Sequence, residues 1–350
     1  MNKRIIYLTQ KSKLKAVTAA LIELGQWPTP YFESNEPDNG AVALQLHPSS
    51  IPIPDRELQA IPGVAQILNG KSSHPLVDAQ SRVPHEIAGY TFNQPGTIPL
   101  LIAGPCSAES RVLIEEAAEM VAESGGLWLR GGAYKPRSSP YSFQGAGEVA
   151  LDWLRLAADS RNLKVVTEAL SERDVSLVAD RSDVIQIGTR NMQNFALLRE
   201  VGKTGKPVLL KRGLCATIEE WLLAGEYLLN AGADSVVFCE RGLRSFDEQT
   251  RNLLDLGAVA LLKHVYGQPI IVDPSHAAGR RDLVLPLSRA ALGAGADGVM
   301  IESHPRAGSA KSDGPQALSI PQLQALALDL GLKTDYERLV SQRVKLKTTS

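Results

Sequence analysis

Apolar residues occur in two different patterns along this chain of 350 residues, as short continuous runs and at helical spacing. Over residues 98–332, eight short apolar runs alternate with segments whose apolar residues recur at helical spacing. The runs are IPLLIAG, LWLRGG, KVVTEA, VIQIGT, PVLLKRG, SVVFCERG, PIIVDPS and GVMIES. Strands buried on both faces are continuously apolar, and eight of them with their covering helices form a barrel of about 250 residues. The pattern therefore predicts an α/β fold whose main domain is a (β/α)8 TIM barrel.

An open, doubly wound sheet is the alternative architecture for alternating strands and helices. Such a sheet normally has fewer strands, and the chain lacks the GxGxxG turn that would support it. The helical segments also carry boundary signals, such as the capping-box pair Thr217 and Glu220 before WLLAGEYLLNAG. The segment IPQLQALALDLG predicts a last helix after the eighth strand. The barrel remains the favoured architecture.

The first seventy residues predict a separate small domain. Strand and helix patterns alternate in the order βαββαβ, over Arg4–Thr9, Leu14–Leu24, Tyr31–Glu33, Ala41–His47, Arg56–Ile61 and Val64–Leu68. That order is typical of a ferredoxin-like fold. We expect a ferredoxin-like domain over residues 1–70, a linker with a β-hairpin near Tyr90–Leu100 over residues 71–97, the barrel over 98–332, and a polar tail over 333–350.

Composition indicates which kinds of binding partner and which cellular compartment to expect for the protein. A formal net charge of −1 provides no overall basic field for nucleic acid or an anionic membrane surface, so neither partner is expected. The three cysteines, Cys106, Cys215 and Cys239, have no paired spacing, which argues against a disulfide framework. The first residues lack the pattern of a signal peptide, and no apolar run reaches the ~20 residues that cross a bilayer. We therefore expect a cytoplasmic protein.

Basic residues collect where the predicted strands end. Active sites of TIM barrels lie at the carboxyl ends of the strands, so these side chains should share one mouth. The basic residues are Arg130, Lys135, Arg137, Arg190, Lys211 and Arg241. Crowded like charges repel unless anions lie between them, and guanidinium groups match phosphate and carboxylate oxygens. The set predicts a small ligand with several negative charges; the alternative is a group of solvated loop charges paired with nearby acids.

A second group of residues at the same strand ends combines sulfur, nitrogen and oxygen donors. Cys106, His276, Glu302 and Asp313 suit one divalent ion such as Mn²⁺, Fe²⁺, Co²⁺ or Zn²⁺. Taken singly, Cys106 also fits a small buried apolar residue, and His276 fits a general base or a phosphate donor. His304 is a candidate to line the same face behind the four donors. The other two cysteines are expected to be ordinary core or surface thiols.

Several longer motifs are more specific than any single residue. They are IAGPCSAES, LRGGAYKPRSSPYSFQG, VTEAL, QIGTRNMQNF, VLLKRG, CERG, VDPSHAAGRRDLV and IESHP followed by KSDGPQ. In this order they resemble the 3-deoxy-7-phosphoheptulonate (DAHP) synthase family, in its class I beta branch. The resemblance implies a metal-dependent transferase that condenses phosphoenolpyruvate with erythrose 4-phosphate, the first step of the shikimate pathway. It also implies a ferredoxin-like domain before the barrel.

The resemblance assigns roles to individual residues. It implies metal ligation by Cys106, His276, Glu302 and Asp313. It implies phosphoenolpyruvate binding by Arg130, Lys135, Arg190, Lys211 and Arg241, with Glu168 beside these cations. It implies erythrose 4-phosphate binding by Pro136, Arg137, Ser138 and Asp273. Lys135 is the candidate for proton transfer, and His276 is a candidate for both ligation and catalysis.

Other functions share parts of this pattern. A 3-deoxy-octulosonate 8-phosphate synthase has the same barrel and first substrate but carries a KANRSS-type motif, where this chain has Lys135-Pro136-Arg137-Ser138-Ser139. A non-catalytic barrel that binds phosphorylated metabolites would lack a metal donor or an arginine, and none is missing here. A lyase would use a Schiff-base lysine, for which Lys211 is the candidate. The resemblance also implies an aromatic amino acid as effector and a homo-oligomer, with a tetramer as the expected size.

Overall fold

The chain forms two compact units, residues 1–78 and residues 79–350. The computed structural model describes residues 4–31, 43–47, 50, 53–70, 72–81, 84–135, 139 and 141–332. The expected tail over residues 333–350 and the segment Pro136–Ser138 lie outside the described residues. Among the described helices, none combines the length and the apolar character needed to cross a membrane.

The first unit is a four-stranded antiparallel sheet with two helices. Its elements are β1 (Arg4–Leu8), α1 (Leu14–Glu23), β2 (Pro28–Tyr31), β3 (Ala43–Leu46), α2 (Asp55–Gln59) and β4 (Val64–Asn69). The strand order in the sheet is β2-β3-β1-β4, as in a ferredoxin-like fold. Apolar side chains from both helices pack on one face of the sheet, with Ile6, Val17, Leu21, Leu44 and Leu58 at the centre of that core. The predicted ferredoxin-like order is confirmed.

Strand β2 begins earlier in the chain than expected. The sequence favoured Tyr31–Glu33; the described strand covers Pro28–Tyr31 and contains two prolines, and residues 32–33 lie outside the described residues. Proline lacks the N–H that a central strand needs. Among the described strands, β2 lies at the edge of the sheet and pairs with β3, a position that tolerates both prolines.

The segment between the sheet and the barrel is more ordered than its sequence suggests. It contains the helix α3 (Pro75–Gln80) and a hairpin of β5 (His85–Ile87) and β6 (Tyr90–Phe92). The helix was not predicted, and the hairpin had been expected nearer Tyr90–Leu100. The tight turn uses Ala88 and Gly89, both with positive φ. An alanine gives no turn signal, which explains why the position was missed.

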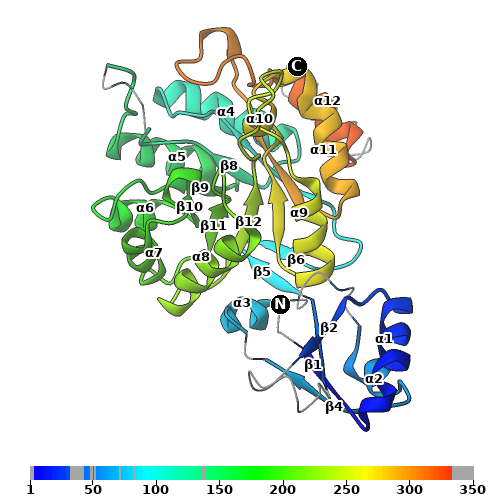
Figure 1. Ribbon diagram of the computed structural model, residues 1–350. Coiled ribbons are helices and arrows are strands. Elements are labelled where there is room, and N and C mark those ends of the chain that lie inside the picture. Colours follow the sequence, from blue (N-terminus) through cyan, green and yellow to red (C-terminus); the bar gives the residue numbers. More distant parts are fainter. Residues whose placement is uncertain are drawn as a thin grey trace. The chain divides into compact units, whose positions relative to one another are not determined.

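The second unit contains a closed barrel of eight parallel strands. They are β7 (Leu100–Gly104), β8 (Trp128–Arg130), β9 (Lys164–Glu168), β10 (Val184–Ile187), β11 (Val208–Lys211), β12 (Val236–Glu240), β13 (Ile270–Val272) and β14 (Gly298–Glu302). Each strand pairs with the next, and β14 pairs with β7 from Gly298 opposite Leu100 to Glu302 opposite Gly104, which closes the ring. All eight predicted strands are present, so the predicted TIM barrel is confirmed (Figure 1).

Helices surround the strands on the outside of the barrel (Figure 1). They are α4 (Arg111–Glu123), α5 (Glu148–Ser160), α6 (Val175–Arg181), α7 (Phe195–Gly202), α8 (Ile218–Asn230), α9 (Leu256–Ala260), α11 (Val284–Gly293) and α12 (Ile320–Asp329). The short helix α10 (Pro274–Ala278) lies instead at the carboxyl end of β13 and carries His276. The capping box of Thr217 and Glu220 starts α8, as the sequence predicted. The predicted last helix is α12.

The β5–β6 hairpin closes the amino end of the barrel. Phe92, Tyr90 and Ile87 belong to the same buried cluster as the inward side chains of the strands. The indole N–H of Trp128 donates to the carbonyl oxygen of Ala88 over 3.1 Å. Side chains thus fill the centre of the barrel at this end, and active sites of TIM barrels lie at the opposite end, where the strands have their carboxyl ends.

Candidate active site

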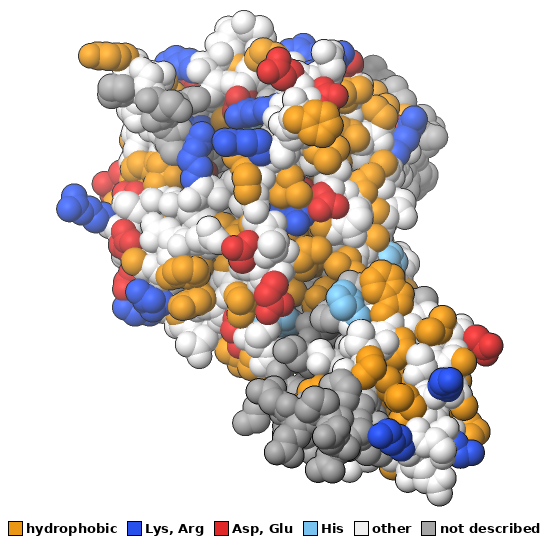
Figure 2. Space-filling view, viewed as in Figure 1, with side chains coloured by type: hydrophobic (Ala, Val, Ile, Leu, Met, Phe, Trp, Pro, Cys, Tyr) orange, Lys and Arg blue, Asp and Glu red, His pale blue; other side chains and the backbone are white. Residues whose placement is uncertain are grey.

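A cavity of about 390 Å³ lies at the carboxyl ends of the barrel strands. Basic side chains from four strand ends and their loops line it: Arg130, Lys135, Arg190, Lys211, Arg241 and Arg251. Glu168 and Asp313 are the acidic residues in the lining. Figure 2 shows a group of Lys and Arg side chains close together on the upper part of the barrel unit. Five of the six cations that the sequence predicted therefore share one cavity; Arg137 lies outside the described residues.

Two of these arginines are buried with nitrogens that lack a partner. Arg130 and Arg241 are 5% and 7% exposed. Among the described residues, the Nη1 atom of each makes no hydrogen bond. The nearest acid to Arg130 is Glu302, whose Oε2 lies 3.9 Å from Nη1. A buried donor without a partner destabilises the folded state, so these nitrogens are suited to a ligand that brings its own anionic oxygens.

Side chains of β11 and the residues after it alternate between the cavity and the outer layer. Lys211 points to the cavity, whereas the next residue, Arg212, contacts Glu240 over 3.0 Å and Asp255 over 2.8 Å. Its guanidinium carbon also lies 5.6 Å from the centre of the Trp221 ring. Arg212 therefore holds the barrel wall together and is not available to a ligand, although the sequence places it beside Lys211.

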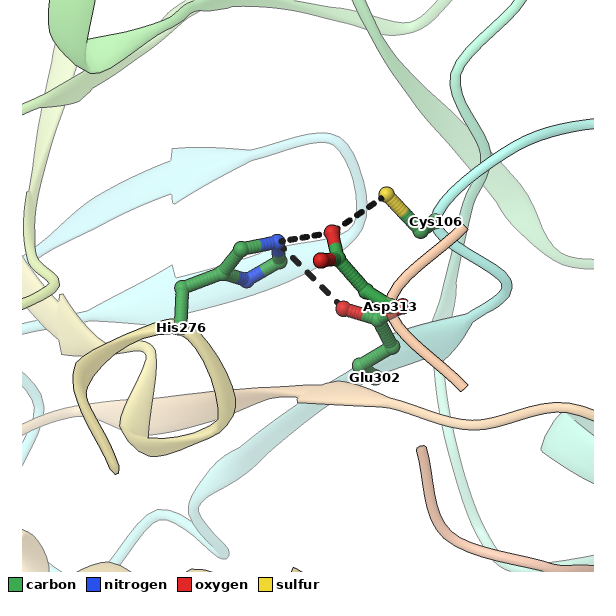
Figure 3. A group of neighbouring side chains, drawn as sticks. All are labelled: Cys106, His276, Glu302 and Asp313. Atoms are coloured by element: carbon green, nitrogen blue, oxygen red, sulfur yellow. Dashed lines mark hydrogen bonds and ion pairs between the residues drawn. The ribbon is translucent and has the colours of Figure 1, made fainter. Parts of the chain in front are cut away.

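The four expected metal donors converge beside the cations. One donor atom from each of Cys106, His276, Glu302 and Asp313 lies within 4.8 Å of the other three. The Sγ of Cys106 is 3.1 Å from Oδ2 of Asp313. The Nε2 of His276 is 3.3 Å from Oε2 of Glu302 and 3.7 Å from Oδ2 of Asp313. Figure 3 shows the four side chains pointing toward one another.

Backbone conformation brings these donors together. Gly104 ends β7 with φ of 143°, and a Cβ there would lie 2.1 Å from the carbonyl oxygen of Arg130. This close approach of two strands places Cys106, two residues later, beside β8. Asp313 belongs to the loop after β14 and has φ of 53°, a conformation that aspartate adopts more readily than most residues. The loop returns to the barrel where Ser303 pairs with Leu318.

Asp273 orients His276. Its carboxylate accepts hydrogen bonds from the backbone N–H of His276 over 3.0 Å and from Nδ1 over 2.8 Å. Lys211 donates to the same carboxylate over 2.5 Å. Burial lowers the pKa of His276 to about 3, and Asp273 offsets this only in part. The imidazole is therefore neutral near pH 7, with a proton on Nδ1 and a lone pair on Nε2 that faces the carboxylates.

Protonation of the other donors follows from burial. Burial raises the pKa of Glu302 to about 7, although Arg130 opposes the shift. Burial likewise raises the pKa of the Cys106 thiol. Burial would also raise the pKa of Asp313, but His276 and the hydrogen bond from Cys106 lower it. A neutral imidazole, a thiol and two carboxylates thus direct lone pairs at one point, an arrangement that a divalent cation would stabilise.

The donor set fits a borderline divalent metal ion. It combines one sulfur, one nitrogen and carboxylate oxygens, as such ions prefer. The Oε1 of Glu302 is buried and has no hydrogen-bond partner among the described residues, so an acceptor atom is left for an ion. The cluster is therefore consistent with a divalent metal site.

Two glycines make room for charged side chains in the cavity. A Cβ on Gly188 would lie 1.9 Å from Oε1 of Glu168. A Cβ on Gly132 would lie 2.6 Å from Nζ of Lys135 and 2.7 Å from the carbonyl oxygen of Cys106. The glycines of the LRGG and QIGT motifs thus allow Lys135 and Glu168 to reach the cavity. Among the described residues, the hydrogen-bond partner of the Glu168 carboxylate is Gln186, at 3.3 Å, and not a cation.

Other expected residues lie elsewhere or are engaged differently. Asp273 is fully buried and saturated by Lys211 and His276, which favours a positioning role; its binding of the second substrate stays a prediction. His304 is buried, its Nδ1 accepts from the backbone N–H of Arg306 over 2.9 Å, and its Nε2 is 3.9 Å from Glu109. Cys215 is an exposed thiol and Cys239 a buried one, both free.

Sequence reasoning missed Arg251 and Gln316. Arg251 lies in the loop between β12 and α9 and lines the cavity. Gln316 lies in the loop after β14 and donates to Oε2 of Glu302 over 2.8 Å. Neither ends a predicted strand. A loop arginine is usually a solvated charge, so no local signal identifies Arg251. Gln316 ends the KSDGPQ motif, but the sequence assigned no role to it.

Comparisons with known proteins agree with this geometry. Residues 92–337 match the sequence model of the DAHP synthetase I family. A phospho-2-dehydro-3-deoxyheptonate aldolase of Thermotoga maritima is 52% identical over 242 residues, which cover 67% of this chain and 72% of that protein. A 2-dehydro-3-deoxyphosphooctonate aldolase of Azoarcus sp. is 31% identical over 275 residues, or 71% of this chain and 94% of that protein.

Two solved structures resemble the chain. The DAHP synthase of Thermotoga maritima aligns over 95% of this chain and 97% of its own, with a TM-score of 0.71 and 38% identity. A truncated form of the enzyme from the same organism covers 72% of this chain and 91% of its own, with a TM-score of 0.66 and 45% identity. On its sequence and its fold, the chain belongs to the DAHP synthetase I family.

Proposed function

We propose that the chain condenses phosphoenolpyruvate with erythrose 4-phosphate to give 3-deoxy-D-arabino-heptulosonate 7-phosphate and inorganic phosphate. The observation that carries this proposal is one cavity in which six basic side chains surround a four-donor cluster. Two phosphorylated reactants bring the anions that this many cations need. Family membership and the relative that is 52% identical support the same reaction.

Arg130, Lys135, Arg190, Lys211 and Arg241 are proposed to bind the phosphate and carboxylate of phosphoenolpyruvate. The unpartnered Nη1 atoms of Arg130 and Arg241 are available to anionic oxygens without breaking an existing hydrogen bond. Glu168 lines the same cavity and limits its net positive charge. For erythrose 4-phosphate, the segment Pro136–Ser138 is proposed from the family motif; it lies outside the described residues.

Cys106, His276, Glu302 and Asp313 are proposed to hold one divalent ion, with Mn²⁺, Fe²⁺, Co²⁺ or Zn²⁺ as candidates. Such an ion would supply Lewis acidity to the aldehyde oxygen of the second substrate. We assign His276 to this centre and not to proton transfer. Its Nδ1 is engaged by Asp273, and its Nε2 faces the carboxylates of Glu302 and Asp313.

In the proposed reaction, C3 of phosphoenolpyruvate forms a bond to the aldehyde carbon. Water adds to C2, and the bond between C2 and the phosphate oxygen breaks to release phosphate. Cavity cations hold both substrates so that the reacting carbons meet, and positioning of this kind can supply much of the acceleration. Lys135 lines the same cavity as Cys106, His276 and Asp313, and is proposed to give the proton that the new alkoxide takes up.

The eight-carbon product is the competing reaction, because a relative named for it is 31% identical. The two reactions differ in the length of the aldehyde. Purified protein with Mn²⁺ and phosphoenolpyruvate should be assayed for phosphate release with erythrose 4-phosphate and with arabinose 5-phosphate. We expect turnover with the four-carbon sugar and little with the five-carbon sugar. The reverse preference would overturn the assignment of the second substrate. No turnover with either sugar would overturn the proposal that the chain catalyses this condensation.

The amino-terminal unit is proposed to bind an aromatic amino acid that inhibits the enzyme, and the chain is proposed to form a tetramer. Both proposals rest on the resemblance to the class I beta branch. Tyrosine and phenylalanine should inhibit the full chain but not a chain that lacks residues 1–78, a truncation suggested by the compact second unit and by the truncated relative. Inhibition that survives the truncation would place the effector elsewhere. Sedimentation equilibrium would measure the number of subunits.

A further inference from the structure

Two side chains outside the donor cluster link its two carboxylates. Gln316 is 3% exposed, and its Nε2 donates to Oε2 of Glu302 over 2.8 Å. The Nη1 of Arg251 lies 3.4 Å from Oε1 of the same glutamine. It also lies 3.3 Å from Oδ1 of Asp313. A continuous chain of contacts therefore runs from Asp313 through Arg251 and Gln316 to Glu302.

This chain of contacts engages one oxygen of each carboxylate. The other oxygen of Asp313, Oδ2, faces Sγ of Cys106 and Nε2 of His276. The other oxygen of Glu302, Oε1, has no hydrogen-bond partner among the described residues. For Glu302, the Oε2 atom that accepts from Gln316 also lies 3.3 Å from Nε2 of His276. A carboxylate that is held at one oxygen cannot rotate freely, so Asp313 keeps Oδ2, and Glu302 keeps Oε2, directed at the cluster before any ion arrives.

The supporting residues are themselves held in place. The backbone N–H of Arg251 donates to the carbonyl oxygen of Ala278 over 3.0 Å. A Cβ on Gly279, whose φ is 70°, would lie 2.7 Å from Cβ of Arg251. On the other side, Arg281 donates to the carbonyl oxygens of Pro315 over 3.0 Å and of Gly314 over 2.8 Å. Both loops that carry the chain of contacts are thus fixed to the segment that follows α10.

We propose that Gln316 and Arg251 are positioning residues of the metal centre. They fix the orientation of Glu302 and Asp313 in advance and thereby strengthen binding of the divalent ion. The inference rests on the proposed function only in taking the four donors as a metal centre. Partners of this kind around a metal site commonly change metal affinity by about 10–100-fold when they are removed.

The charge of Arg251 affects metal affinity in the opposite direction to its contact with Asp313. A guanidinium beside a divalent cation repels it, so loss of the charge alone would tighten metal binding. Loss of the contact to Asp313 would weaken binding, because that carboxylate would no longer be held. The two effects are opposite in direction, and Gln316 carries no charge, so its removal reports orientation alone.

The experiment titrates the metal-free full chain with Co²⁺ and follows the visible absorption of the bound ion. Gln316→Met keeps the volume and removes the donor and acceptor; Gln324→Met, at an exposed position of α12, is its control. Arg251→Ala removes the second residue; its side chain is 45% exposed, and Arg111→Ala, at 66%, is its control. Thermal unfolding of the metal-free variants checks that each one folds.

We expect Co²⁺ to bind about 10–100-fold more weakly to Gln316→Met than to the wild type, with an altered absorption spectrum. Binding to Arg251→Ala should also be weaker, by a smaller factor, because loss of the positive charge offsets part of the effect. The controls should match the wild type in both readouts. Unchanged affinity and spectrum in Gln316→Met, or tighter binding by Arg251→Ala, would overturn the inference and leave the metal centre intact. If Gln316→Met does not fold, Arg251→Ala still decides the outcome. A wild-type chain that binds no Co²⁺ would overturn both this inference and the proposed metal centre.

Discussion

The two ends of the barrel bury charged groups in opposite ways. At the amino end, Asp297 accepts from Lys263, from the backbone N–H of Ile270 over 2.9 Å and from that of Asn93 over 3.3 Å. Lys263 also donates to Oδ1 of Asn93 over 2.7 Å. At the carboxyl end, Nη1 of Arg130 and Nη1 of Arg241 are buried without partners among the described residues.

This difference separates groups that stabilise the fold from groups that await a ligand. A buried charge with all its hydrogen bonds made by protein atoms has nothing to offer a substrate. A buried charge with open hydrogen-bonding atoms lowers stability until a ligand arrives. Mutation of Asp297 should therefore change stability, and mutation of Arg130 or Arg241 should change substrate binding.

Lys135→Met should have the largest effect. We expect turnover to fall by about 10²–10⁴-fold if Lys135 transfers a proton. The KM for phosphoenolpyruvate should change much less, because the arginines of the cavity remain. Steady-state rates of phosphate release measure both quantities. Unchanged turnover would remove Lys135 from the mechanism.

Arg241→Ala tests the carboxyl end of the barrel, where buried arginine nitrogens lack partners among the described residues. The KM for phosphoenolpyruvate should rise by about 10–100-fold, because hydrogen bonds to charged groups contribute about 1.5–3 kcal/mol. The unfolding temperature should stay the same or rise, since Nη1 has no partner to lose. A large loss of stability with unchanged KM would show that Arg241 belongs to the fold and not to the binding site.

Metal affinity should depend on pH. In the metal-free protein burial raises the pKa of Glu302 to about 7, so below that pH a proton occupies the carboxylate and competes with the ion. Affinity should therefore fall by at least about tenfold for each pH unit below 7. It should continue to rise above 7, because burial raises the pKa of the Cys106 thiol, which must also lose its proton to bind the ion. Mn²⁺ titrations at pH 6, 7 and 8 measure this slope. An affinity that is flat across this range would contradict the assigned protonation of Glu302.

Asp297→Ala tests the amino end of the barrel, where protein donors bind the carboxylate, and should have the smallest effect on catalysis. Removing Asp297 leaves Lys263 without its carboxylate, and stability should fall by about 3 kcal/mol, near the lower limit because Lys263 retains some contact with water. Turnover and KM of the folded protein should stay within about twofold of the wild type, as expected for a distant site. Denaturant unfolding and the phosphate-release assay give the two readouts.

The barrel could be predicted from the sequence because its strands are uniformly apolar. Runs such as PVLLKRG and PIIVDPS leave few alternatives to a buried parallel strand. Edge features were harder to predict, since Pro28 and Pro30 argue against a strand in any central position, and the hairpin turn places an alanine, Ala88, at a positive φ before Gly89. Local sequence says nothing of where an edge will lie.

Site residues at the ends of strands could be predicted from the sequence. Site residues in the loops could not. Arg130, Lys211 and Glu302 lie in strands, and barrel geometry alone directs them to one mouth. Arg251 and Gln316 reach it through loops whose paths depend on contacts distant in the chain, such as those of Arg281 with Gly314 and Pro315. The resemblance implied that Asp273 binds the second substrate, whereas its contacts with Lys211 and His276 depend on residues distant in the chain or on a helix turn that the motif does not specify.

The central claim is that Cys106, His276, Glu302 and Asp313 hold one divalent ion on which catalysis depends. The most direct test treats the full chain with a chelator and then titrates it with Mn²⁺, while bound ion and phosphate release are measured together. We predict no turnover without metal, recovery in proportion to one ion bound per chain, and loss of both binding and recovery in Cys106→Ala with the barrel still folded. Full turnover in the metal-free protein, or in Cys106→Ala, would contradict the account.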